Sequence, residues 1–425
     1  MHRFAYKGKE LYCEETPVSK IAASVGTPFY LYSLGTFLDH FLKLKRAFAP
    51  IDPLICFSMK ANSNLTVLKT LVNHGSGLDI VSRGELFRAK KVGVDPSKIV
   101  FASVGKTELE IEEAVLHGIF MFNVETLQEL EVINSVARRL KTAQKVAIRL
   151  NPDVAPDTHH YITTGTKQNK FGIDLETATK LFTDTDRYPF LRFCGVHVHI
   201  GSQITNAKPF VKAIRKTLAF IDRVRAAGCA SVDTLNIGGG LGIIYSKEKP
   251  QTAQEFADAV LPILQRSRKK NPLKIVLEPG RFISGNSGIF VTKVLYEKRT
   301  PAKAFLIVDG GMNDLIRPSL YGAYHEILPV VKKNVKARYS RVDIVGPVCE
   351  SGDFLAKERS LPTARVGDIL AVMSCGAYGH VMSSNYNSRP RTPEVVVKGK
   401  RFFIARRRET LLDLVRHERI VTEVV

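Results

Sequence analysis

Short apolar and β-branched runs recur between about Leu54 and Glu278, and amphipathic or longer connecting segments separate them. The runs read LICFSMKA, GLDIVS, KIVFAS, IFMFNV, KVAIRLN, GVHVHIGS, TLNIGGG and KIVLEPG. Several of the intervening segments have helical spacing and charged outer faces, notably Glu108 to His117, Leu127 to Leu140 and Pro209 to Ala227. Short buried strands that alternate with amphipathic helices are typical of parallel βα units.

Eight such strands match the number that closes a (β/α)8 TIM barrel, a fold that usually takes about 250 residues. A doubly wound open sheet is the alternative. Polar residues favour the barrel, because they fall at or just past the C-terminal ends of their strands, where barrel active sites are built. They are Lys60, Ser82, Arg149, His199, the glycine run from Gly238, and Glu278. We therefore expect an α/β chain with a TIM barrel.

After about Gly285 the pattern changes to strands without long helices between them: IFVTKVLY, AFLIVDGG, RVDIVGP, DILAVMS and PEVVVKGKRFFIARR. This pattern predicts a mainly antiparallel β domain. The N-terminal runs FAYKGKELYC and TPFYLYS also read as strands. A chain of 425 residues exceeds the usual size of a single core. We expect a barrel domain over residues 36–285 and a β-barrel or sandwich domain formed by residues 1–35 and 286–425.

The net charge of +21 invites a nucleic-acid interpretation, since clustered basic residues release counterions from phosphate backbones. The basic residues are spread over the whole length without a binding motif, so we expect no nucleic-acid partner. The six cysteines form no CxxC pair, which favours reduced thiols in a cytoplasm. The N-terminus lacks the apolar core of a signal peptide and no long apolar run follows, so we expect no membrane anchor.

Two strand ends carry residues that are costly to bury. Lys60 follows LICFSM, and a charged lysine inside a barrel points to a lowered pKa or a covalent adduct. A lysine that emerges into solvent is the alternative. Glu278 ends an apolar strand, where a carboxylate is rare unless it is paired. A pyridinium N–H would be a suitable partner, and a structural salt bridge is the alternative.

A glycine run could hold a phosphate. Gly238, Gly239, Gly240 and Gly242 follow a strand and precede helical sequence, so their backbone N–H groups could approach an anion closely, and Ser202 could add a hydroxyl. Barrels often bind phosphate between strands seven and eight, which is where this run lies. A tight turn would use the same glycines.

Two further side chains could take part in binding or catalysis. His199 lies two residues after His197, so in a strand both would point into the barrel, and one could stack on a cofactor ring. A core histidine is the alternative. Cys349 lies in a turn beside Glu350 and Asp353, surroundings in which a thiol suits a general acid better than a nucleophile. An inert cysteine is the alternative, and no metal site is expected.

In their order along the chain, FSMKAN, HVHIGSQ, NIGGGLG, LEPGR and GPVCESGD resemble the fold-type III pyridoxal-phosphate decarboxylases. The resemblance covers essentially the full length and is strongest to the branch that acts on diaminopimelate. The segments FASVGK and SSNYNSRPR depart from relatives without touching the chemistry. An amine, an aromatic ring, a phosphate cradle, a buried carboxylate and a thiol together fit pyridoxal 5'-phosphate.

The resemblance implies a role for each matched residue. Lys60 is similar to the lysine that holds the cofactor covalently, Glu278 to the partner of the pyridine nitrogen and His199 to the stacking ring. The positions that match contacts to the cofactor phosphate are Ser202, Gly239, Gly240, Arg281 and Tyr378, and Gly280 matches a further cofactor-binding position. Cys349 is similar to a cysteine that reaches the site from a second subunit and protonates the substrate carbon, which implies a homodimer with shared active sites.

Substrate choice in this family depends on residues that face the distal end of the substrate. Diaminopimelate has a distal carboxylate and a distal ammonium, which arginine, tyrosine and glutamate side chains could bind. The matching positions are Arg281, Arg317, Tyr321, Glu350 and Tyr378. The resemblance therefore implies conversion of meso-2,6-diaminopimelate to L-lysine and carbon dioxide, the last step of lysine synthesis.

Other activities share this barrel and cofactor. A decarboxylase for ornithine, arginine or carboxynorspermidine is the nearest alternative, and Arg317 with Glu350 argues against the first two. An amino-acid racemase would carry a tyrosine base and lack CESGD. A catalytically dead homologue that binds a partner protein should not keep Lys60, Glu278 and Cys349 together.

Overall fold

The computed structural model describes residues 2–154, 170–229, 231–270, 272–333 and 339–422. The chain divides into two compact units. The barrel unit comprises Leu38–Ile244 and Glu248–Ile283, and the β unit comprises Met1–Phe37, Tyr245–Lys247 and Ser284–Val425. Each unit is described separately below.

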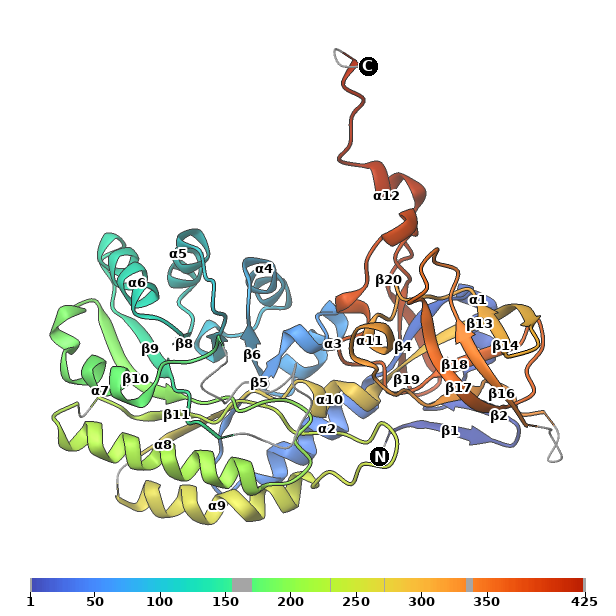
Figure 1. Cartoon of the computed structure of the whole chain (residues 1–425). Helices are drawn as coiled ribbons and strands as arrows, with labels where there is room; N and C mark the ends of the chain where they lie inside the picture. Colours follow the sequence, from blue (N-terminus) through green and yellow to red (C-terminus); the bar gives the residue numbers. More distant parts are fainter. Residues whose placement is uncertain (1, 155–169, 230, 271, 334–338, 423–425) are drawn as a thin grey trace. The chain divides into compact units, whose positions relative to one another are not determined.

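The barrel unit contains a closed barrel of parallel strands in the order β10-β11-β12-β5-β6-β7-β8-β9 (Figure 1). The strands are β5 (Leu54–Ser58), β6 (Gly77–Ile80), β7 (Ile99–Phe101), β8 (Met121–Val124), β9 (Gln144–Arg149), β10 (Leu191–His197), β11 (Thr234–Asn236) and β12 (Lys274–Leu277). Each of the eight strands predicted from the apolar runs is present, and β12 pairs with β5 to close the barrel. The TIM barrel is confirmed and the open sheet is excluded.

Helix α2 (Leu34–Ala47) leads into β5, and further helices connect the barrel strands that follow. The connecting helices are α3 (Leu65–Val72), α4 (Arg83–Val92), α5 (Glu108–His117), α6 (Leu127–Arg139), α7 (Leu175–Thr183), α8 (Lys208–Ala226) and α9 (Ala253–Lys270). Side-chain caps set several helix starts, because an oxygen at the N-cap satisfies backbone N–H groups that the helix leaves unpaired. Thr107 and Glu110 form a capping box at the start of α5, whose bounds are those predicted from the sequence.

The β unit contains a nine-stranded, mostly antiparallel sheet with the path β17-β16-β14-β13-β4-β19-β20, and β18 pairs with β13 and β15. Its strands are β4 (Phe29–Ser33), β13 (Gly288–Arg299), β14 (Ala304–Val308), β15 (Ile327–Pro329), β16 (Tyr339–Val345), β17 (Phe354–Pro362), β18 (Ile369–Val372), β19 (Glu394–Lys398) and β20 (Arg401–Arg406). Only the β14–β16 and β4–β19 pairs are parallel. The predicted mainly antiparallel character is therefore confirmed.

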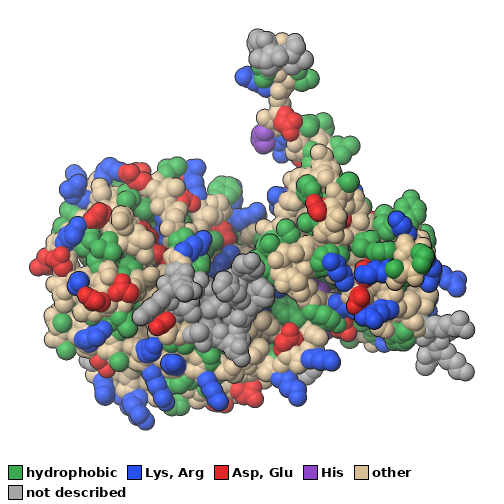
Figure 2. Space-filling model, viewed as in Figure 1, with side chains coloured by type: hydrophobic (Ala, Val, Ile, Leu, Met, Phe, Trp, Pro, Cys, Tyr) green, Lys and Arg blue, Asp and Glu red, His purple; other side chains and the backbone are tan. Residues whose placement is uncertain are grey.

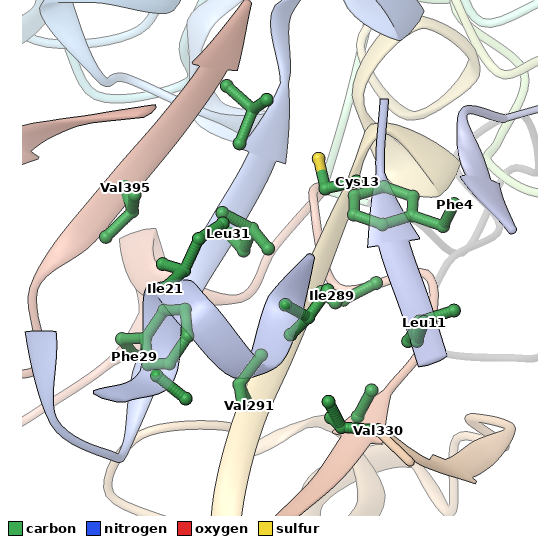
Figure 3. Close-up of a cluster of buried hydrophobic side chains, with 14 of the residues drawn as sticks. Phe4, Leu11, Cys13, Ile21, Phe29, Leu31, Ile289, Val291, Val330 and Val395 are labelled. Atoms are coloured by element: carbon green, nitrogen blue, oxygen red, sulfur yellow. The ribbon is translucent and has the colours of Figure 1, made fainter. Parts of the chain in front are cut away.

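The N-terminal segment adds a small sheet of β1 (Phe4–Lys7), β2 (Glu10–Cys13) and β3 (Thr16–Pro17), followed by α1 (Val18–Val25). Its apolar side chains share one buried cluster with strands from the second half of the chain (Figure 3). Phe4 and Phe29 lie in this cluster with Ile289, Val330 and Val395. Burying these side chains together joins the two ends of the sequence within the β unit.

Surface charge and cysteine state add two observations. On the face shown in Figure 2, lysine and arginine side chains are interspersed with aspartate and glutamate over both units. All six cysteines are free, and Cys349 alone among them is exposed. Within the described ranges, no helix is both long and apolar enough to cross a membrane.

Candidate active site

Glu278 follows β12 and is held by side chains from three other barrel strands. The Nδ2 atoms of Asn123 on β8 and Asn236 on β11 donate to Glu278 Oε1 at 2.8 and 2.6 Å. His197 Nε2, at the end of β10, lies 3.1 Å from Oε2. Burial alone would raise the pKa of Glu278, but the attraction and hydrogen bond of His197 and the charge of Lys60 lower it below the ordinary value. The result is a buried, ionised carboxylate.

Lys60 lies in the single 3-10 turn Met59–Ala61 that follows β5. Its Nζ is 3.4 Å from Oδ2 of Asp79, a fully buried residue of β6. Ser58 donates a hydrogen bond to the same oxygen, while Asp79 Oδ1 has no partner among the described residues. Burial raises the pKa of Asp79 to about 6, against the opposing effect of Lys60. The lysine amine is therefore held at the barrel end by a carboxyl group.

The raised pKa of Asp79 predicts a pH-dependent effect of Asp79→Asn on stability. The folded protein binds the Asp79 proton up to about pH 6, while the unfolded chain releases it near pH 4, so this group stabilises the fold less as pH rises through that window. The melting temperature of Asp79→Asn, relative to wild type, should rise between pH 4.5 and 7 in cofactor-free protein.

The matched control is Asp95→Asn. Hydrogen bonds from Ser97 lower the pKa of the exposed Asp95 carboxyl, so it is ionised across the same pH range. Scanning calorimetry of this variant should show no trend with pH. If the melting temperature of Asp79→Asn relative to wild type also stayed constant with pH, the assigned titration of Asp79 would be wrong.

The glycine run packs closely against neighbouring backbone. A Cβ on Gly239 would lie 2.1 Å from the carbonyl oxygen of Glu278, and one on Gly240 would lie 2.4 Å from that of Gly201. Gly240 also has φ +107°, a conformation that side chains rarely allow. Only glycine fits at these two positions, because a side chain would collide with the neighbouring backbone.

The expectation that the glycine run leads into a helix is wrong. Residues 237–252 contain no helix, and α9 begins only at Ala253. Leu241 pairs with Ile204 in an isolated parallel bridge, and this pairing keeps the chain extended. Any phosphate at this position would therefore contact loop backbone and not the start of a long helix.

Two side chains that could donate hydrogen bonds to a phosphate lie together in the barrel unit. Arg281, the first residue of the short helix α10 (Arg281–Ser284), donates from Nε and Nη2 to Ser202 Oγ at 3.2 and 3.1 Å. Gly280 precedes it, and a Cβ there would press against Ser58 and Ala61 at about 3 Å. A guanidinium and a hydroxyl thus lie together within the barrel unit.

His199 lies outside a strand, because β10 ends at His197. The expectation that both histidines lie in one strand is therefore wrong for His199. His199 Nδ1 accepts a hydrogen bond from the Gly239 N–H at 3.2 Å. Burial lowers the pKa of His199 well below its ordinary value, assisted by Lys60 and Arg149. A neutral ring anchored to the glycine loop is suited to stacking.

The other two strand-end residues have structural partners. Ser82 caps α4, where its hydroxyl accepts a hydrogen bond from the Glu85 N–H. Arg149 forms a buried ion pair with Glu125, and its guanidinium lies 4.7 Å from the centre of the Phe171 ring. Ser82 is a helix cap, and Arg149 contributes positive charge at this end of the barrel.

The remaining predicted site residues belong to the β unit. Arg317 opens α11 (Arg317–Tyr321), is buried, and donates to Nε2 of His325 at 2.8 Å. His325 Nδ1 lies 2.8 Å from the carbonyl oxygen of Met373 and donates to it, which leaves Nε2 as the acceptor. The Tyr245 ring lies under the guanidinium at 4.8 Å. Arg317 is therefore fixed in place, and Tyr321 is half-buried at the end of the same helix.

Cys349 and Glu350 lie in an exposed turn. The Cys349 N–H donates to Asn387 Oδ1 at 2.8 Å, and Ser319 of α11 donates to the Gly352 carbonyl at 2.5 Å. These bonds hold the turn against α11 and the loop around Asn387. Tyr378 is half-buried in another loop of this unit, with φ +55°.

Sequence reasoning missed four polar residues of this site or left them without a role. Asp79, Asn123, Asn236 and His197 each interrupt or end an apolar strand run. A polar residue in a run that is otherwise wholly buried was the available signal, since such groups need partners. They prove to be the partners of Lys60 and Glu278.

The donor set fits pyridoxal phosphate. Lys60 could bind the aldehyde carbon, Glu278 the pyridine nitrogen, and His199 the ring face. Ser202, Arg281 and the glycine loop could hold the phosphate. The buried, ionised carboxylate of Glu278, which could accept the pyridinium proton, is the observation that supports this fit.

Comparison with known proteins points the same way. The family described as pyridoxal-dependent decarboxylase, pyridoxal binding domain, matches residues 34–285. The diaminopimelate decarboxylase of Aquifex aeolicus is 45% identical, over 95% of this chain and 94% of its own length.

Solved structures are similar over nearly the whole chain. Diaminopimelate decarboxylase from Helicobacter pylori, complexed with L-lysine, has a TM-score of 0.89 and 40% identity, covering 96% of this chain and all of its own. The enzyme from M. jannaschii, also with L-lysine, has a TM-score of 0.93 and 35% identity, covering 99% of each chain. The chain therefore belongs to the pyridoxal-dependent decarboxylases and, among them, to the diaminopimelate decarboxylase family.

Proposed function

We propose that this protein converts meso-2,6-diaminopimelate to L-lysine and carbon dioxide with pyridoxal phosphate, as the last step of lysine biosynthesis. The observation that carries the proposal is the buried, ionised Glu278, whose pKa the charge of Lys60 helps to lower, at the C-terminal end of the barrel. Full-length similarity to diaminopimelate decarboxylases supports the choice of substrate.

The direct test measures carbon dioxide release and lysine formation by purified protein with pyridoxal phosphate. Meso-diaminopimelate is offered beside ornithine, arginine and lysine. Turnover confined to diaminopimelate is expected. Turnover of another amino acid alone would keep the cofactor chemistry and overturn the substrate, and no turnover would overturn both.

In this mechanism the residues of the barrel would bind and orient the cofactor. When bound, pyridoxal phosphate supplies an electron sink for the carbon–carboxylate bond that breaks. Lys60 would provide the amine that attaches the cofactor, and Asp79 positions that amine. Glu278 would hold a proton on the pyridine nitrogen, because its own carboxyl stays ionised. His199 would orient the ring, and Ser202 with Arg281 would bind the phosphate.

The proton that replaces the lost carboxylate comes from Cys349 in this proposal. Its exposed position in the turn suits a group that serves the active site of a second subunit. We therefore propose a homodimer with shared active sites. Analytical ultracentrifugation should show a dimer, and an active monomer would contradict the sharing.

Substrate recognition is assigned to charged groups that match the two ends of diaminopimelate. Arg317 and Arg281 are suited to its carboxylates, with hydroxyls from Tyr321 and Tyr378, and Glu350 is suited to the distal ammonium. The fixed orientation of Arg317 between His325 and Tyr245 supports this role, since a preorganised guanidinium loses little entropy on binding.

Arg317→Ala should therefore raise the Michaelis constant for diaminopimelate on the order of 10²-fold, the value of one buried charge-assisted contact. Cofactor affinity, followed by absorbance titration, should change little. Arg341→Ala is the control, because it removes an exposed arginine of the same unit that pairs with Glu358. An unchanged Michaelis constant in Arg317→Ala would remove the residue from substrate binding.

We also propose a cytoplasmic location. Six free thiols, five of them buried, suit a reducing compartment. Fractionation of cells that express the protein should place it with cytoplasmic markers, and recovery from a membrane or secreted fraction would contradict the proposal.

A further inference from the structure

A cavity of about 680 Å³ lies within the β unit, and none of the residues assigned above to the active site lines it. Its walls come from the turn between β1 and β2, from β15 and the residues after it, and from the end of β17. The volume is within the range of small-molecule binding sites.

Aromatic rings and cations meet in this cavity. Lys332 Nζ lies 3.8 Å from the centre of the Tyr6 ring, and the Arg359 guanidinium lies 4.0 Å from that of Tyr324. Tyr339 is 69% exposed at the same site. The two cations cover one face of the Tyr6 and Tyr324 rings, whereas the exposed Tyr339 ring offers a flat surface on which a planar ligand can stack.

The charge of the lining favours an anion. Basic side chains line the cavity at Lys9, Lys332, Lys333 and Arg359, against the single carboxylate of Glu326. Lys333 is neutralised by Asp368, whereas Lys332 and Arg359 form no ion pair with any described residue. A ligand with two or more negative charges would compensate them.

The walls are held in place by hydrogen bonds. The Lys332 N–H donates to the Lys9 carbonyl at 2.7 Å, and the Tyr6 hydroxyl donates to the Pro329 carbonyl. Burial, with Glu326 nearby, raises the pKa of Tyr6 to about 12, so that this donor keeps its proton. The cavity is therefore preformed, which reduces the entropy lost on binding.

We infer that this cavity binds a small anion of the nucleoside diphosphate class, with its base on the exposed Tyr339 ring and its phosphates against Lys332 and Arg359. Apolar side chains of β15 and β17 form the rest of the wall. A ligand of this class would use both the stacking surface and the cations, whereas an inorganic anion or an uncharged ring would use only one of them.

The cavity is also connected to Arg317. Arg359 Nη1 donates to the His325 carbonyl at 2.8 Å, and His325 Nε2 accepts from Arg317. A ligand that binds Arg359 would therefore affect His325, the residue that holds Arg317 in place. This connection rests on the substrate role proposed for Arg317, and it predicts a changed Michaelis constant for diaminopimelate when the cavity is filled.

Isothermal calorimetry tests the site without reference to activity. ADP is titrated into the holoenzyme, in which the cofactor already occupies its phosphate site, and saturable binding is expected. Lys332→Ala should weaken it about fivefold or more, the value of one lost charge contact. Lys357→Ala is the matched control, because Lys357 lies on β17 at 4.0 Å from the Phe354 ring but outside the cavity.

Two further probes separate the parts of the ligand. Adenosine and inorganic pyrophosphate should each bind more weakly than ADP, because each lacks half of the contacts. No saturable heat with ADP up to about 5 mM, or equal weakening in both variants, would overturn the site. Pyrophosphate binding as tight as ADP would overturn the stacking. Binding of ADP with an unchanged Michaelis constant would overturn the connection to Arg317.

Discussion

Lys60→Ala protein is expected to lose decarboxylase activity by at least about 10⁴-fold and to lose covalent attachment of the cofactor. Lys60 is the amine placed beside Asp79 and close enough to Glu278 to influence its pKa. Alanine removes the only atom that can form the bond at this position. Borohydride reduction followed by peptide mass spectrometry locates the attachment, and carbon dioxide release measures the activity.

The control for this variant is Lys180→Ala, which removes an exposed lysine of the barrel unit that pairs with Glu176. It should keep both activity and attachment. If Lys60→Ala protein retained both properties, the covalent assignment would be wrong and the lysine would be structural.

Glu278→Gln is expected to lower kcat by about 10²- to 10³-fold while cofactor binding persists, a loss typical of removing one preorganised electrostatic contact. Glutamine keeps the shape but not the charge. Its oxygen can still accept from Asn123 and Asn236, which leaves its NH2 group facing His197. Steady-state kinetics with saturating cofactor measures the effect. The fall should appear in kcat more than in the Michaelis constant.

Glu278→Asp separates charge from structure, because it restores the carboxylate at a shorter reach. Its kcat should lie between those of wild type and Glu278→Gln. Glu113→Gln, which removes a carboxylate paired with Arg83 on the outer surface, should leave kcat unchanged. Equal activity in Glu278→Gln and wild type would exclude the electrostatic role.

Much of the fold could be predicted from the sequence because its signals are local. Eight apolar runs predicted the eight barrel strands, and a Thr107–Glu110 capping box accounts for the agreement at α5. β17 was missed because FLAKERSLP carries polar residues along an exposed side and lacks an apolar run. The helix expected after the glycines was wrong because the pairing of Leu241 with Ile204 is a long-range contact.

The candidate site was predicted only in part, for the same reason. Residues that carry distinctive chemistry, such as Lys60 and Glu278, could be identified from their type and from their place at strand ends. Asn123 and Asn236 could not, because both donate to one oxygen only after β8 and β11 have closed into the same barrel. The partners of a buried charge come together only when the barrel closes, so a short stretch of sequence cannot reveal them.

The position of β4 in its sheet has a consequence for how the protein is made. β4 is an early segment, Phe29–Ser33, yet it pairs with β13 on one side and with β19, Glu394–Lys398, on the other. During synthesis the strands of the barrel leave the ribosome before either partner of β4 is complete. The sheet of the β unit can therefore close only when translation is almost finished, and a chain that stops before β19 would present an unpaired strand edge on which newly made copies can aggregate.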